Sequence, residues 1–197
     1  MWDKTYATDT YVYGEEPNQF LQQNTRHLAQ GNVLCLADGE GRNSVFLAKL
    51  GFNVTAVDLS LVGLEKARKL AEKHQVSVNY IHADLAEFDL GTELWDSIVA
   101  IFCHLPQPLR QALHQRLASS LKPNGVYLVE GYTPEQLNYK TGGPPKAEMM
   151  LSQSILQNEL HGLNFHHLQE LEREVHEGIN HHGLGHVVQA IGIKNNE

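Results

Sequence analysis

The sequence predicts an α/β fold. It is a doubly wound, three-layer arrangement in which a seven-stranded, mostly parallel sheet with one antiparallel strand has helices on both faces. Three observations support this. Short apolar runs alternate with helical patterns through the middle of the chain, which is typical of βαβ units. The run Ser97–Cys103 is nearly all apolar, as in a central strand covered on both faces. The last 35 or so residues contain strand-like runs that predict a hairpin.

Five strands are expected in the first two thirds of the chain, each a short run of apolar or β-branched residues. They are Val33–Ala37, Asn53–Val57, Val76–Ile81, Ser97–Cys103 and Val126–Glu130.

Helical patterns connect these strands. Val45–Leu50 reads as a helix that stops at Gly51, and Glu65–Lys73 is rich in strong helix formers behind the N-cap candidate Ser60. Leucine recurs at positions 109, 113, 117 and 121, which predicts a helix closed by the turn residues Lys122–Gly125.

The pattern changes after Gly131. Pro134–Pro145 reads as a loop, and Lys146–Leu160 reads as a helix. Phe165–Val175 fits either a helix or a strand. The strand is preferred, with Glu177 and Gly178 opening a hairpin loop before a strand at Val187–Ile193.

Composition limits the functional classes. A chain of 197 residues, 42% of them hydrophobic, fits one domain. The two cysteines, Cys35 and Cys103, lie in apolar runs, and no signal peptide or membrane-spanning run is evident, so we expect reduced thiols and a cytoplasmic protein. A net charge of −8 without a Lys/Arg cluster argues against nucleic acid and is compatible with a small-molecule substrate.

The strongest chemical signal is the turn Asp38–Asn43 between a predicted strand and a predicted helix. Its glycines let the backbone approach a ligand closely, and the following helix offers free N–H groups to an anionic group. Asp58 follows Gly41 by 17 residues, at the end of the next strand, where a carboxylate can accept hydrogen bonds from both ribose hydroxyls. The pattern predicts a nucleoside site.

Two other interpretations of the turn remain open. It is a purely structural turn in many proteins, and the Gly-x-Gly-x-x-Ser spacing of residues 39–44 approximates a nicotinamide dinucleotide fingerprint. Asp84 favours S-adenosylmethionine, because an acid at the end of the third strand can accept a hydrogen bond from the adenine amino group. Alone, Asp84 fits a helix cap or a surface charge equally well.

The sequence resembles class I S-adenosylmethionine-dependent methyltransferases, most closely the small tellurite-resistance and thiopurine type. The resemblance covers nearly the whole chain. The residues that support it are Trp2-Asp3-Lys4-x-Tyr6, Tyr13-Gly14-x-x-Pro17-Asn18-x-Phe20-Leu21, Gly41-Arg42-Asn43 and Phe102-Cys103-His104-Leu105-Pro106. Pro134–Leu137 and Thr141–Pro144 look like features of one bacterial subgroup.

The first motif departs from the family pattern at three positions. Cys35 stands where an acid is usual, Ala37 where a glycine is usual, and Asp38 where cysteine or serine is usual. The carboxylates of Asp38 and Glu40 are candidates to meet the cofactor's ammonium group in place of the missing acid.

The resemblance implies a Rossmann-like methyltransferase domain over residues 1–197, with a lid segment at 1–31, a cofactor-binding half at 32–131 and a substrate side at 132–197. It places S-adenosylmethionine against the backbone of Ala37–Gly41, with Arg42 and Asn43 beginning the helix. The other implied cofactor residues are Asp58 at the ribose, Leu59, Asp84 and Leu85 around the adenine, and Ile101 and Phe102 below the sulfonium. The individual residues of the turn are Ala37, Asp38, Gly39, Glu40 and Gly41.

Methyl transfer from a sulfonium rests largely on alignment and exclusion of water. A thiol or a chalcogen oxyanion needs no protein base, whereas a hydroxyl or amine acceptor does. His104 is the candidate base by position, with a structural hydrogen bond as the alternative. Cys103 is disfavoured as a nucleophile because an apolar strand end raises a thiol pKa. Tyr6, Tyr11 and Tyr13 are expected either as an aromatic lid or as surface packing of an N-terminal arm.

No metal site is expected, because His181, His182 and His186 fall in what reads as a solvated hairpin loop. The alternatives to methyl transfer are a non-catalytic nucleoside-binding protein and an NAD(P)-dependent oxidoreductase. The sequence leaves the oligomeric state open.

Overall fold

The computed structural model describes residues 2–195. Over these residues, one seven-stranded sheet has the order β3-β2-β1-β4-β5-β7-β6. The strands are β1 (Asn32–Leu36), β2 (Asn53–Asp58), β3 (Asn79–His82), β4 (Trp95–Ile101), β5 (Leu121–Tyr132), β6 (Leu163–His176) and β7 (His182–Lys194). The first five are parallel, and β7 is antiparallel to both β5 and β6. The predicted mixed sheet with one antiparallel strand is confirmed.

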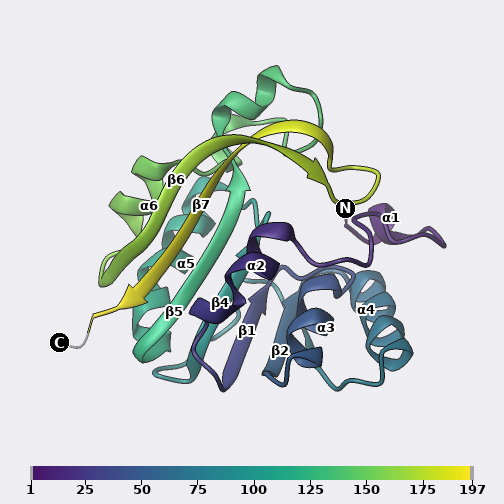
Figure 1. Cartoon of the computed structure of the whole chain (residues 1–197), viewed down its shortest axis with the longest axis horizontal. Coiled ribbons are helices and arrows are strands. Elements are labelled where there is room, and N and C mark those ends of the chain that lie inside the picture. The colour runs from purple at the N-terminus through teal and green to yellow at the C-terminus, as the bar shows by residue number, and fades with distance from the viewer. Residues whose placement is uncertain (1, 196–197) are drawn as a thin grey trace.

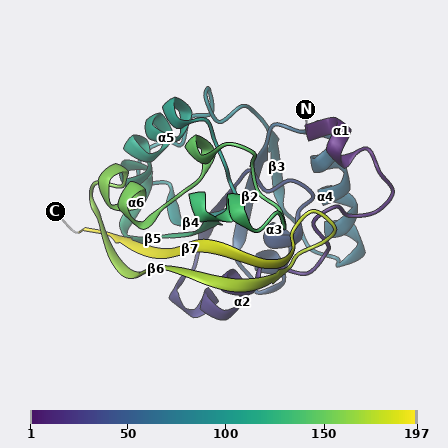
Figure 2. The ribbon, with the colours of Figure 1, turned by 90° about the horizontal axis from the view of Figure 1, so that it is seen from above.

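Helices cover both faces of the sheet, as Figures 1 and 2 show. They are α1 (Trp2–Tyr6), α2 (Gln19–Asn24), α3 (Arg42–Lys49), α4 (Leu61–Lys73), α5 (Gln107–Ser120) and α6 (Gln153–Glu159). Three short 3₁₀ turns are η1 (Thr25–His27), η2 (Pro134–Asn138) and η3 (Ala147–Met149). Each of these helices is too short or too polar to serve as a membrane span within residues 2–195.

Alternating side chains of the central strands divide the core into two layers. Val33 and Cys35 of β1 point toward α2 and α3, where they pack with Leu47. Leu34 and Leu36 point to the opposite face and pack with the leucines of α5. Every residue of β1 from Val33 onward is buried, because the strand has apolar neighbours on both faces.

Two predicted elements differ from the structure. The helix expected over Lys146–Leu160 is instead η3, an extended link and the short α6. Ser152 begins α6 by accepting a hydrogen bond from Ile155 N–H, and Leu151 N–H is already bonded to Tyr132 O. The turn expected at Lys122–Gly125 lies within β5, which starts at Leu121 and passes through an irregularity where Asn124 has φ 61°.

The ambiguous segment Phe165–Val175 is a strand, as preferred, and belongs to the 14-residue β6. With β7 it forms a long, bent hairpin that arches over the carboxyl ends of the parallel strands (Figure 1). The hairpin tip reaches the N-terminal segment, where Ile179 N–H donates to Val12 O at 2.8 Å.

Candidate active site

The turn after β1 is tied to the end of β2 by one buried carboxylate. Asp58 Oδ2 accepts a hydrogen bond from Gly39 N–H at 2.8 Å, and Oδ1 accepts one from Ser60 N–H at 2.8 Å. Burial raises the pKa of Asp58, and the two backbone N–H groups oppose that shift. Asp58 therefore fixes the shape of the turn and presents a carboxylate at the carboxyl edge of the sheet.

Two neighbouring strands end in strained backbone. Ala37, directly after β1, and Phe102, directly after β4, both have φ 50°, a left-handed conformation that non-glycine residues rarely adopt. Gly39 and Gly41, in the same turn as Ala37, have φ 59° and 90°. Strain of this kind gathers at ligand-binding sites, where the surrounding structure holds it in place. Both strands thus deliver strained residues to the same edge.

The acids of the turn have different partners. Ser44 Oγ donates to Asp38 Oδ2 at 2.5 Å, and burial raises the pKa of Asp38 to about 7 against that hydrogen bond. Glu40 forms a buried ion pair with Lys66 of α4. The Asp38 carboxyl is therefore held by Ser44 with a pKa raised to about 7, and the Glu40 carboxylate is held by Lys66.

Arg42 begins α3 and contacts the far end of the chain. Its Nη2 lies 2.5 Å from Glu177 Oε2 in the loop between β6 and β7. Asn43, the next residue, accepts a hydrogen bond from Asn18 N–H at 2.9 Å through its side-chain oxygen. The start of α3 thereby holds both the N-terminal segment and the hairpin.

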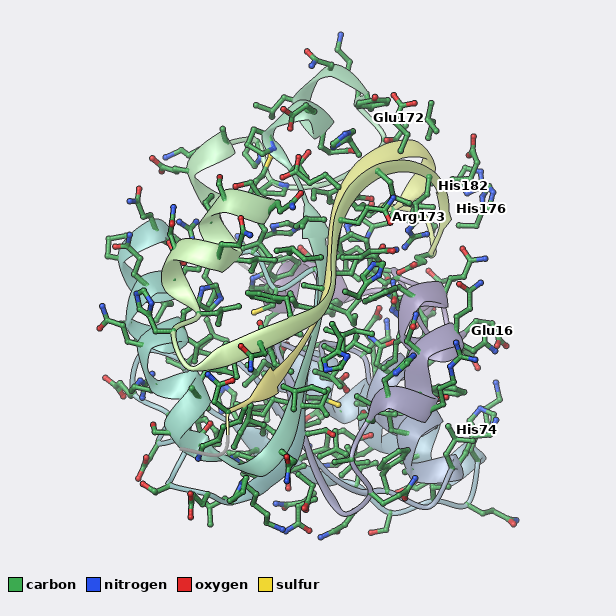
Figure 3. The ribbon with its side chains drawn as sticks, turned by 60° about the vertical axis from the view of Figure 1, so that its left-hand side comes forward. Glu16, His74, Glu172, Arg173, His176 and His182 are labelled. Atoms are coloured by element: carbon green, nitrogen blue, oxygen red, sulfur yellow. The ribbon has the colours of Figure 1, made fainter. Side chains whose placement is uncertain are left out.

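Glu177 belongs to a buried polar network that sequence reasoning missed. Arg173 Nη2 contacts Glu130 Oε2 at 2.7 Å and Glu177 Oε1 at 2.8 Å, and Asn18 Nδ2 donates to both carboxylates. Although burial raises it, the Arg42 and Arg173 guanidinium groups hold the pKa of Glu177 below its usual value. The two arginines and two glutamates balance in charge. Figure 3 labels Arg173 under the bend of the hairpin, with His176 and His182 at its outer side.

The N-terminal arm, residues 2–18, lies over the turn. Tyr6 is buried against it, and a Cβ added to Gly39 would lie 2.6 Å from the Tyr6 hydroxyl oxygen. Asp3 accepts a hydrogen bond from Ser60 Oγ at 2.6 Å, which anchors the arm beside the loop after β2. Lys66 Nζ donates to the carbonyl oxygens of residues 6, 8 and 10. The path of the arm over the turn is therefore fixed from α4.

Aromatic rings converge above the end of β4. Phe102 lies 4.6 Å from both the Tyr132 and His181 ring centroids, and Tyr13 lies 4.7 Å from His181. Tyr6 touches Tyr13 edge-on at 6.2 Å. Of the three tyrosines expected either as a lid or as surface packing of the arm, Tyr6 and Tyr13 join this cluster. Tyr11 instead packs under Lys66, with its hydroxyl donating to Lys66 O at 3.0 Å.

The remaining predicted cofactor residues lie around the same edge. Asp84 is exposed two residues beyond His82, which pairs with Asp58 in the sheet, and its Oδ1 accepts from Ala86 N–H at 2.9 Å. Leu59 is 54% exposed, which leaves its side chain free to cover a ligand. Leu85 and Ile101 are buried in the core beneath, on opposite faces of the sheet.

His104 has both ring nitrogens engaged by backbone groups. Nε2 accepts a hydrogen bond from Tyr132 N–H at 3.2 Å, so Nδ1 carries the proton that it donates to Met149 O at 3.2 Å. Burial lowers the pKa of His104 to about 4. The catalytic base stays a prediction, and these hydrogen bonds favour the structural alternative. Burial raises the pKa of the Cys103 thiol to about 12, which agrees with its expected lack of nucleophilic activation.

The three hairpin histidines have three environments. His181 is buried in the aromatic cluster rather than solvated as expected, and His182 is exposed beside the His176 ring. His186 forms a hydrogen bond with Thr133 Oγ1 at 2.6 Å. A ring nitrogen of His186 and carboxylate oxygens of Glu135 and Glu170 all lie within 4.8 Å of one another, as the ligands of a metal ion could. Sequence spacing offered no signal for that last grouping, because the acids come from η2 and β6.

Comparison with known families agrees with this geometry. Residues 33–125 match a family model described as a methyltransferase domain. Ubiquinone biosynthesis O-methyltransferase of Histophilus somni (strain 2336) is 33% identical over 115 residues, covering 55% of this chain and 48% of that protein. The tRNA (uracil(54)-C(5))-methyltransferase of Pyrococcus abyssi is 29% identical over 152 residues, covering 68% of this chain and 35% of that protein. The chain spans about half the length, or less, of these curated relatives.

Solved structures share the fold over most of the chain. A structure described as "Conversion of a Disulfide Bond into a Thioacetal Group during Echinomycin Biosynthesis" has a TM-score of 0.78 at 18% identity, covering 100% of this chain and 92% of that one. TehB from Haemophilus influenzae has a TM-score of 0.74 at 18% identity, covering 98% of this chain and 66% of that one.

The seven-stranded, mostly parallel sheet is the fold that this chain shares with these solved structures. Residues 33–125 of the chain are similar to a methyltransferase domain, and they lie within a Rossmann-like fold. The family and the fold imply S-adenosylmethionine as the cofactor.

Proposed function

We propose that this protein is an enzyme that transfers a methyl group from S-adenosylmethionine to a small-molecule acceptor. The observation that carries the proposal is the junction of Gly39 and Asp58. Gly39 has left-handed backbone, and its N–H donates a hydrogen bond to the buried Asp58 carboxylate at 2.8 Å, at the carboxyl edge of the parallel strands. That junction offers close backbone approach and an acceptor for ribose hydroxyls in one place.

The residues present fit the cofactor. An added Cβ would lie 2.6 Å from the Tyr6 hydroxyl oxygen at Gly39 and 2.6 Å from Ala67 Cβ at Gly41, so both positions require glycine. In the proposal, the backbone of Ala37–Gly41 holds the methionine part and Asp58 holds the ribose. Leu59, Asp84 and Leu85 surround the adenine, and Asp84 accepts a hydrogen bond from the adenine amino group.

When bound, the cofactor supplies an electrophilic methyl group on a sulfonium. The chain's own residues align the acceptor with this methyl group and exclude water from the site. Ile101 and Phe102 lie below the sulfonium position, and the rings of Tyr6 and Tyr13 cover it and present faces that attract a cation. Asp38, with Glu40 nearby, takes the place of the acid usual at position 35 and faces the ammonium group.

A small acceptor is favoured over a nucleic acid. The chain carries a net charge of −8, and its buried Arg42 and half-buried Arg173 are paired with glutamates. Neutralisation of phosphates would require free cationic side chains in a cluster. Among small acceptors, a thiol fits the uncharged aromatic surroundings better than a chalcogen oxyanion, which would need a cationic partner in the site.

Calorimetry with S-adenosylmethionine, S-adenosylhomocysteine and NADH tests the proposal. Both sulfur compounds should bind and NADH should not. Asp58→Ala should weaken binding roughly 100-fold or more, because hydrogen bonds to a charged group contribute about 1.5–3 kcal/mol each. Glu72→Ala, an exposed position on α4, is the matched control and should bind as the wild type does.

Circular dichroism must show that Asp58→Ala is folded, and Asp58→Asn, which keeps an acceptor oxygen, provides a milder variant. Binding of NADH alone would point to an oxidoreductase. Tight binding of S-adenosylmethionine without turnover on any acceptor would point to a non-catalytic binding protein.

A further inference from the structure

Two buried polar atoms beside the aromatic cluster have no hydrogen-bond partner within residues 2–195. They are the Tyr132 hydroxyl oxygen and His181 Nδ1. Tyr132 is fully buried, and His181 is 7% exposed. Folded proteins leave few such groups unpaired, and each one that they keep calls for an explanation such as an absent ligand. Both side chains belong to one place, since their rings meet edge-on at 5.2 Å.

A pair of glycines packs directly onto these two side chains. A Cβ added to Gly142 would lie 2.5 Å from Asn180 O, 2.9 Å from His181 Cδ2 and 3.2 Å from the Tyr132 hydroxyl oxygen. A Cβ added to Gly143 would lie 2.9 Å from Tyr132 Cδ2. Larger residues would displace the ring pair. The Thr141–Pro144 motif of the sequence thus has a structural reason, because it closes a wall over these two polar groups.

The place of the pair relative to the cofactor residues is set by Phe102. Its ring centroid lies 4.6 Å from that of Tyr132 and 4.6 Å from that of His181. Phe102 follows β4, below the position proposed for the sulfonium. A molecule bonded to Tyr132 and His181 would therefore lie next to the methyl group rather than at the adenine end.

Neither polar group carries charge at neutral pH. Burial and the nearby Arg42 guanidinium lower the pKa of His181 to about 3. Burial and the Glu177 carboxylate raise the pKa of Tyr132. The surrounding ions Arg42, Arg173 and Glu177 are paired with one another or with Glu130. The pair is neutral, and it offers a hydroxyl donor beside an imidazole nitrogen that accepts when the other nitrogen holds the proton.

We propose that the Tyr132 hydroxyl and His181 Nδ1 form the acceptor-binding site, and that its ligand is a small uncharged molecule bearing a hydroxyl or thiol group. The inference rests on the proposed function. A hydroxyl or thiol is both donor and acceptor, so it satisfies both groups at once by accepting from Tyr132 and donating to His181. The aromatic walls suit an apolar body on the ligand.

Binding to the complex with S-adenosylhomocysteine tests the proposal by calorimetry. Phenylmethanethiol and catechol are the uncharged probes, and benzoate and selenite are the anionic ones. At least one uncharged probe should bind 10-fold or more tightly than either anion. Tyr132→Phe and His181→Asn should each weaken that binding about 10-fold, with unchanged affinity for S-adenosylhomocysteine. Tyr139→Phe, whose hydroxyl bonds Glu172, and His182→Asn, at an exposed neighbour, should bind the probe like the wild type.

Thermal unfolding of the ligand-free variants gives a second readout. Tyr132→Phe should keep or raise the unfolding midpoint, because it removes an unpaired buried hydroxyl, whereas loss of a structural hydrogen bond would lower it. The inference would be overturned by a lowered midpoint of Tyr132→Phe or by tighter binding of an anion. It would also be overturned if neither uncharged probe bound, or if both variants bound the probe as tightly as the wild type. Failure of S-adenosylhomocysteine to bind the wild type would instead overturn the proposed function itself.

Discussion

Arg42 and Glu177 lie 135 positions apart in the chain and form a buried ion pair, with 2.5 Å between Nη2 and Oε2. One residue opens the helix after the glycine turn, and the other opens the loop of the last hairpin. This contact therefore links the turn that would hold the cofactor to the hairpin that carries His181.

Removal of Arg42 from its buried ion pair should lower the free energy of unfolding more than removal of a residue from an exposed ion pair. Arg42→Met leaves a buried carboxylate with less compensation, and a broken buried pair costs about 3–5 kcal/mol. We expect about 3 kcal/mol, because Glu177 keeps Arg173. Urea unfolding measures the loss. Lys73→Met breaks the exposed Lys73–Glu15 pair and should cost less than about 1 kcal/mol. Equal losses in the two variants would contradict this.

Stability should depend on pH through Asp38. Its pKa is about 7 in the folded protein against 3.8 as the ordinary value, so the folded state binds the proton more strongly. Proton binding to Asp38 stabilises the folded protein fully below pH 3.8, the ordinary pKa of the group, and this stabilisation is lost as pH rises through about 7. The free energy of unfolding of the wild type should therefore fall, relative to Asp38→Asn, between these values.

Urea titrations at a series of pH values measure that difference. Asp9→Asn, which changes an exposed acid of the N-terminal arm, should run parallel to the wild type at every pH. A constant difference between wild type and Asp38→Asn would show that the Asp38 carboxyl does not titrate in this range.

His104→Asn separates the two roles considered for this histidine. If the ring serves the hydrogen bonds to Met149 O and Tyr132 N–H, the variant should lose about 1–3 kcal/mol of stability and keep kcat within about 10-fold. A general base contributes roughly 10²–10⁴-fold to the rate, so a larger drop in kcat with a changed pH profile would restore the catalytic role. We expect the structural result.

Ala37→Gly should stabilise the protein. A non-glycine residue in left-handed backbone costs about 1–2 kcal/mol, and the entropy of a glycine offsets roughly 0.5–1 kcal/mol of that. The variant should therefore gain about 0.5–1 kcal/mol in unfolding measurements. Ala112→Gly, at an exposed interior position of α5, should lose about 1 kcal/mol as the matched control. A loss at both positions would mean that the strain at Ala37 is small.

Local sequence signals were sufficient for the parallel half of the fold. Strands β1, β2 and β4 are short apolar runs, and the turn from Asp38 to Asn43 combines glycines with a helix start. Each of these features lies within a few residues, where periodicity and turn chemistry decide the structure. The same locality made Asp58 and Asp84 visible as acids at strand ends.

The structure of the substrate side was harder to predict from the sequence, because its contacts join distant segments. Glu130 and Arg173 are 43 positions apart in the chain, and the sheet order places Glu130 on β5 and Arg173 on β6, with β7 between them. His181 looked solvated for the same reason. The helix predicted over Lys146–Leu160 was too long, because α6 begins only where Ser152 accepts a hydrogen bond from Ile155 N–H.

The order in which the ribosome releases the chain adds a kinetic consequence to the hairpin. Asn18 emerges early, yet its side chain bonds Glu177, whose codon is read 159 positions later. β6 likewise waits for β7, since it has no direct pairing with β5. Such long loop closures slow folding. The contacts between Asn18 and the hairpin should thus form last, and nascent-chain proteolysis near Asn18 should record when the hairpin docks.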